Sequence, residues 1–141
     1  MKKNQILLLS LSIVLFMLIS CAPSTKQVLA TKGSQVKLRA IQTRAFDTTD
    51  KDKMLRTVIA TLQDLGFIVD KADDVLGAVS GTKLDRYTLR MTVSVRPRGE
   101  TQLLVRANAQ YNITAVEDPE PYQQFFDALS EAIFLTAHQV D

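Results

Sequence analysis

Apolar and polar residues alternate most clearly in two runs in the second half of the chain. In residues 87–95 and again in residues 103–111, the apolar side chains occupy the odd-numbered positions. The turn-forming sequence Pro97-Arg98-Gly99-Glu100 separates the two runs. Alternation with a period of two is typical of strands that bury one face. We therefore predict an antiparallel β-hairpin with one apolar and one polar face.

The register of this hairpin follows from the same pattern. Apolar positions share a face only if paired residue numbers have an even sum. We expect Val95 to pair with Leu103, which leaves a five-residue loop over residues 97–101. In this register Arg106 lies opposite Thr92.

Helical spacing marks a segment that follows Thr49 and Asp50, both good N-cap residues. Thr49 with Asp52 resembles a capping box, and Gly66 stands where a helix commonly ends in a glycine. Between these signals, one stripe of a helix would carry Met54, Leu55, Val58, Leu62 and Leu65.

A second amphipathic helix is predicted near the end of the chain, with Pro121 in its first turn. Its apolar stripe consists of Tyr122, Phe125, Phe126, Leu129, Ile133 and Ala137. Leu62 and Leu129 each lie in the middle of their stripes, so we expect both to be buried.

Residues 36–46 are predicted to form the first strand, because Val36, Leu38 and Ala40 alternate with polar residues. A further strand starts at residue 67 and either continues to residue 82 or is interrupted near residues 72–74. The resulting order is β-α-β-β-β-β-α, or one strand fewer. This order predicts an α+β fold with a four- to five-stranded antiparallel sheet and two helices packed on one face.

The beginning of the chain has a different composition. Lys2 and Lys3 precede an almost purely apolar run over residues 6–19. That run is shorter than the roughly 20 residues that a helix needs to span a bilayer. A short basic segment followed by an apolar run of this length is typical of a secretory signal peptide.

Leu18-Ile19-Ser20-Cys21 resembles the lipobox of bacterial lipoprotein signals. The resemblance implies that diacylglycerol is attached to the Cys21 thiol and that the chain is cut before it. We therefore expect a removed signal peptide (1–20), a lipidated flexible tether (21–34) and a single α+β domain (35–141). The alternative is an uncleaved anchor helix with an incidental cysteine. Lipidation would explain Cys21, the only cysteine, which cannot form an internal disulfide.

The net charge of the mature chain bears on whether its partner is a nucleic acid. The whole chain has 17 basic and 15 acidic residues, and removal of Lys2 and Lys3 makes these numbers equal. A neutral mature chain lacks the basic excess of nucleic-acid-binding proteins, so we expect no nucleic-acid partner.

A second resemblance covers about residues 36–141. It rests on three segments: residues 42–47, QTRAFD; residues 62–67, LQDLGF; and residues 77–83, GAVSGTK. These segments resemble a pattern in small proteobacterial envelope lipoproteins of unassigned function. The layout is also similar to the helix-grip domains of the C lipoprotein of the outer-membrane β-barrel assembly machinery. That family supplies no catalytic residues, so the resemblance implies a non-catalytic module.

The sequence offers residues for a phosphate-binding, metal or catalytic site, but they lack the spacing or the partners that each site requires. Gly77, Gly81 and Lys83 do not form a phosphate-binding loop, which needs lysine directly after the second glycine and a helix next. The acidic residues between 70 and 85 do not have calcium-loop spacing. His138 is the only histidine, so a zinc site or a hydrolytic triad lacks partners. We expect no metal and no cofactor.

Arg90, Arg96 and Arg106 share the polar face of the predicted hairpin, with Arg98 at its tip. In the expected register Arg90 lies opposite Asn108. This face is either a docking surface for an acidic partner or lipid headgroups, or a solvated face whose arginines provide solubility.

The sequence therefore predicts a periplasm-facing lipoprotein that is not an enzyme and that serves an envelope assembly or transport system. Ala22 follows the lipidated cysteine, where aspartate would favour the inner membrane, and this implies the outer membrane. Two alternatives stay open: an enzyme that attacks cell-wall glycan with Asp47, Asp64 or Asp70, and a structural spacer without a partner.

Overall fold

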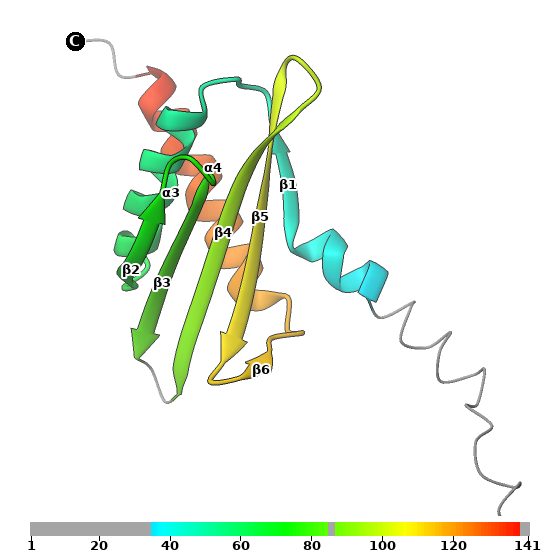
Figure 1. Ribbon diagram of the computed structural model, residues 1–141, viewed down its shortest axis with the longest axis vertical. Coiled ribbons are helices and arrows are strands. Elements are labelled where there is room, and N and C mark those ends of the chain that lie inside the picture. The colour runs from blue at the N-terminus through cyan, green and yellow to red at the C-terminus, as the bar shows by residue number, and fades with distance from the viewer. Residues whose placement is uncertain (1–34, 85–86, 139–141) are drawn as a thin grey trace, which may run out of the picture. The chain divides into compact units, whose positions relative to one another are not determined.

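The computed structural model describes residues 35–84 and 87–138, with side chains as far as residue 135. The expected signal peptide, Cys21 and the expected tether lie outside the described residues. The described chain is an α+β domain built on a six-stranded antiparallel sheet (Figure 1).

The chain order is a short helix over residues 35–41, then the elements labelled in Figure 1. These elements are β1 (Thr43–Phe46), α3 (Lys51–Asp64), β2 (Ile68–Asp73), β3 (Ala78–Leu84), β4 (Thr88–Arg98), β5 (Gln102–Tyr111), β6 (Thr114–Ala115) and α4 (Glu120–His138). The order across the sheet is β1-β5-β4-β3-β2, and β6 pairs with β5. The predicted α+β class is confirmed, with β6 and a third helix added.

The first predicted strand is wrong over most of its length. Residues 35–41 form a helix, and strand structure begins only at Thr43. Leu38 and Ile41, three residues apart, both pack against the core. That spacing suits a helix, and burial of this pair outweighs the three-residue alternation that suggested a strand.

Helix α3 begins and ends near its predicted limits. Its N-cap is Asp50, whose side chain accepts a hydrogen bond from Lys53 N at 2.8 Å, so the capping box from Thr49 is not the arrangement formed. At the other end Gly66 has φ +84°, and Phe67 N donates to Leu62 O at 2.9 Å. This is a Schellman motif, which requires a residue with positive φ.

The segment between α3 and β4 is two strands rather than one. β2 and β3 pair antiparallel, with a bulge between Val69 and Lys71 and a turn over residues 74–77. The predicted interruption near residues 72–74 is therefore a hairpin turn.

The core lies between one face of the sheet and the two long helices, α3 and α4, which pack against each other (Figure 1). Leu62 and Leu129 are fully buried, as predicted. The odd-numbered apolar residues of β4 and β5 line the same core from residue 89 to residue 109. The opposite face of the sheet carries no helix in the described part of the chain.

The predicted hairpin forms, but its register differs by two residues. Val95 pairs with Val105 and not with Leu103, and the loop shortens to residues 99–101. Gly99, with φ +62°, allows this three-residue loop. A shift of two keeps every side chain on its predicted face, so Val95 and Leu103 are both buried.

Candidate functional site

The uncovered face of the sheet is the candidate binding surface, and β4 and β5 form its centre. Even-numbered residues of both strands point to this face, because the odd-numbered ones are buried against the helices. Arg90, Arg96 and Arg106 are all exposed there, as the alternation predicted. Arg98 ends β4 on the same face.

The neighbours of each arginine on adjacent strands are uncharged. Arg106 lies between Ser94 of β4 and Thr43 of β1, not opposite Thr92 as expected. The two-residue shift in register accounts for the difference.

Arg90 lies between Thr82 of β3 and Gln110 of β5, not opposite Asn108. Arg96 is paired with the half-buried Leu104. The arginines therefore project from a surface of hydroxyl, amide and methyl groups that does not neutralise them.

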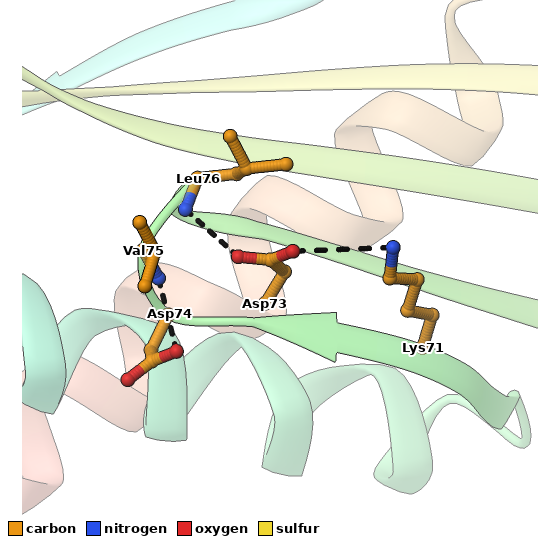
Figure 2. A network of polar contacts seen from close by, with 5 residues as sticks. All are labelled: Lys71, Asp73, Asp74, Val75 and Leu76. Carbon is orange, nitrogen blue, oxygen red and sulfur yellow. Dashed lines mark hydrogen bonds and ion pairs between the residues drawn. The ribbon is translucent and has the colours of Figure 1, made fainter.

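The carboxylates at the β2 edge of this face have partners of their own. Asp70 accepts a hydrogen bond from Thr82 Oγ1 at 2.6 Å. Asp73 lies 3.9 Å from Lys71 Nζ and accepts a hydrogen bond from Leu76 N (Figure 2). Within the described residues, no ion pair involves Arg90, Arg96 or Arg106.

The arginines are spread out rather than clustered. Arg90 and Arg96 are six residues apart on one strand, a distance of about 20 Å at 3.3–3.4 Å per residue. A single phosphate or carboxylate cannot bridge that distance. The surface instead suits an extended partner with several negative charges.

The carboxylates considered for catalysis lie on different parts of the sheet. Asp47 follows β1 and accepts a hydrogen bond from Gln102 Nε2 at 2.6 Å. Asp70 lies on β2, at the opposite edge of the sheet. Asp64 is the exposed last residue of α3. The structure does not bring Asp47 and Asp70 together.

The glycine-lysine segment has structural roles, as expected. Gly77 lies in the β2–β3 turn, and Gly81 and Lys83 lie on β3. A Cβ at Gly81 would lie 3.2 Å from Ile68 O and from Phe67 Cβ, so the neighbouring strand packs closely against this glycine. Lys83 Nζ donates to Leu65 O at 2.9 Å, where a cation stabilises the carboxyl end of α3.

A groove of about 370 Å³ lies between α3 and the edge strand β2. It is lined by Asp52, Leu55, Arg56, Ile59, Ala72, Asp73, Asp74 and Val79. The sequence did not identify this groove, because its two sides come from separate elements that only tertiary packing brings together. The side chains of Asp73 and Asp74 accept hydrogen bonds from backbone amides of the adjacent turn (Figure 2), so they stabilise that turn.

Among the described residues, no group of three or more His, Cys, Asp or Glu side chains is arranged to hold a metal ion. No helix within the described ranges combines the length and the hydrophobicity that crossing a bilayer requires.

Comparison with known proteins does not assign the chain to a family. No protein-family model matches the chain. A search of curated proteins also finds no significant match.

Proposed function

We propose that this chain is an outer-membrane lipoprotein, anchored through Cys21 and facing the periplasm. Its folded domain is a non-catalytic binding or accessory module of an envelope assembly or transport system. The partner is an envelope protein with an extended acidic surface.

The observation that carries this proposal is the arginine-bearing face of the sheet. Arg90, Arg96 and Arg106 are exposed and have uncharged neighbours. Charges arranged in this way increase the rate of encounter with an oppositely charged partner and select against partners of like charge.

The N-terminal sequence supports the location. Leu18-Ile19-Ser20-Cys21 resembles a lipobox, and Ala22 follows it. Two or three acyl chains on one cysteine anchor a protein stably, whereas a single chain binds only reversibly. An anchored module would meet its partner at the membrane surface.

Charge reversal on this face tests the proposal. Arg90→Glu with Arg106→Glu should lower partner binding by at least about tenfold, because like charges across an interface cost several kcal/mol. The free energy of unfolding should change by less than about 0.5 kcal/mol per site, as is usual for exposed residues. Partner binding is measured by site-specific photo-crosslinking from Thr92, an exposed residue between these arginines on the face.

The matched control is the double variant Arg39→Glu with Arg56→Glu. It makes the same change in net charge at exposed positions on the short helix and on α3, and crosslinking from Thr92 should stay as in the wild type. A crosslink that persists unchanged after reversal of Arg90 and Arg106 contradicts the docking surface. Absence of any crosslinked protein from Thr92 in the wild type supports the spacer alternative.

A further inference from the structure

Strand β2 (Ile68–Asp73) forms one edge of the sheet, and most of it is open to solvent. In the described part of the chain it pairs with β3 and with no other strand. Four of its six residues are exposed. Alternate backbone N–H and C=O groups of an edge strand point away from the sheet, where they can pair with another strand. This edge is therefore able to accept a further strand.

The bulge in β2 makes the order of its side chains the same from either end. Pairing with β3 sets the face of each residue, because Val79 and Gly81 of β3 are buried against the helices. The bulge puts Asp70 on the uncovered face, where Thr82 Oγ1 donates to its carboxylate. The uncovered face thus carries Ile68, Asp70, Lys71 and Asp73, and the core face carries Val69 and Ala72. A regular strand of this length alternates strictly and does not have this symmetry.

A second copy of β2, running antiparallel to the first, matches this order residue by residue. With a twofold axis between Asp70 and Lys71, each of these residues lies opposite the other in the second copy. Val69 then lies opposite Ala72 on the core side. A shift by one or two residues in either direction sets a core-facing residue opposite one on the uncovered face. The arrangement of faces therefore selects a single register.

The charges of β2 are complementary in this register. Asp70 of each copy faces Lys71 of the other, so two pairs of opposite charge form across the axis. The Lys71 side chain is 71 % exposed, and its Nζ lies 3.9 Å from Asp73, a long ion pair within its own strand. Charges and bulges commonly protect edge strands from other strands. Here they oppose other registers and favour a second copy in this one.

Large apolar side chains are exposed at both ends of β2. Ile68, at its start, is 72 % exposed, and Val75 and Leu76, in the turn after its end, are 84 % and 66 % exposed. In the antiparallel arrangement Ile68 lies opposite Asp73 of the second copy, beside the turn that carries Val75 and Leu76. This contact occurs twice in a twofold dimer.

The groove between α3 and β2 lies on the core side of the same edge. Its apolar lining consists of Leu55, Ile59, Ala72 and Val79. Val69 and Ala72 of a second copy would point to this side of the joined sheet. The added strand would therefore extend the apolar core at the open side of α3.

We propose that two copies of this chain associate through their β2 strands, with a twofold axis between Asp70 and Lys71. The two sheets then form one continuous antiparallel sheet. Because the axis is perpendicular to the sheet, the arginine-bearing faces of both copies lie on the same side and form one wider surface. This inference goes beyond the proposed function and does not depend on the lipid anchor.

Disulfide crosslinking between two different variants tests the register. Full-length chains carrying Ile68→Cys and Asp73→Cys are purified in detergent, mixed in equal amounts and oxidised. Paired residues on antiparallel strands have Cα atoms about 4.5–5.5 Å apart, within the range of a disulfide. Each introduced cysteine and its own equivalent are separated by the length of β2, about 17 Å. The mixture should give at least about threefold more crosslinked dimer than either variant alone, and the wild type, with Cys21 only, gives the background.

Charge exchange in the same pair of cysteine variants tests the contacts at the axis. Asp70→Lys in both chains, or Lys71→Asp in both, sets like charges opposite each other and should lower the yield by at least about fivefold. Asp70→Lys in one chain with Lys71→Asp in the other makes both contacts opposite in charge again and should restore the yield. The matched controls are Glu117→Lys in both chains and Arg106→Asp in both chains. These controls change the charge equally at exposed positions away from β2 and should leave the yield unchanged.

Two results would overturn the dimer. One is a mixture that crosslinks no more than the single variants, which is also the result expected if β2 binds a strand of a different protein. The other is an equal yield from the like-charge and the exchanged combinations. Circular dichroism verifies that every variant is folded, so that a lost crosslink reports association.

Discussion

At the scale of single residues, Tyr122 shows how this fold satisfies buried polar groups. Its hydroxyl group accepts hydrogen bonds from Gln42 Nε2 and Ala109 N, both at 3.2 Å, and donates to Val116 O at 2.7 Å. Gln42 and Tyr122 are 5 % and 0 % exposed. On one side, β5 pairs with β1 over residues 103–106 and with β6 over residues 110–111. No strand pairs with that side of β5 between these two stretches, and the Tyr122 hydroxyl group accepts the hydrogen bond of Ala109 N there.

Removal of this hydroxyl group should therefore be costly. Tyr122→Phe leaves three buried polar groups without their partner, and we expect a loss of about 2–4 kcal/mol in the free energy of unfolding, given 1–3 kcal/mol for one such group. Urea denaturation followed by circular dichroism measures it. Tyr87→Phe removes an exposed hydroxyl group and should change stability by less than about 0.5 kcal/mol. Equal effects of the two changes would show that the network does not stabilise the fold.

At the scale of elements, the β2–β3 hairpin depends on its turn glycine. Gly77 has φ +65°, and its carbonyl oxygen accepts a hydrogen bond from Val95 N at 2.8 Å. A Cβ at this position would lie 2.6 Å from Val95 O and 2.7 Å from Lys51 Cε. Both backbone conformation and space therefore require glycine here.

Gly99 has nearly the same φ, +62°, but no atom within 4 Å of a Cβ built there. Gly99→Ala should thus report only the conformational cost, about 1–3 kcal/mol. Gly77→Ala should cost at least about 1 kcal/mol more, because a neighbour must move as well. Thermal unfolding of the two variants gives the comparison. A cost at Gly77 no greater than at Gly99 would contradict the steric argument.

At the scale of the whole molecule, the proposed lipid anchor attaches the domain to the membrane. The lipid anchor predicts that Cys21→Ala abolishes labelling by radioactive fatty acid and leaves the precursor uncut or the protein unanchored. Cell fractionation and gel mobility measure both effects. Ser20→Ala, which keeps a small residue before the cysteine, should mature and fractionate as the wild type does. A Cys21→Ala protein that matures and stays in the membrane fraction would refute the lipoprotein interpretation.

The local sequence determined most of the elements. The period-two alternation in residues 87–95 and 103–111 specified the central hairpin and the faces of its side chains, because one buried face forces that pattern. Asp50 and Gly66 marked the limits of α3 through their capping chemistry. The shared face of Arg90, Arg96 and Arg106 followed from the same alternation.

Tertiary structure decided the features that depend on contacts distant in the sequence. The hairpin register could shift by two without changing any face, so the pattern alone could not distinguish Val105 from Leu103 as the partner of Val95. Residues 35–41 became a helix because Leu38 and Ile41 pack on a core supplied by other elements. The network at Tyr122 also joins Gln42, β5 and α4, and its geometry is set only when the sheet and helices pack together.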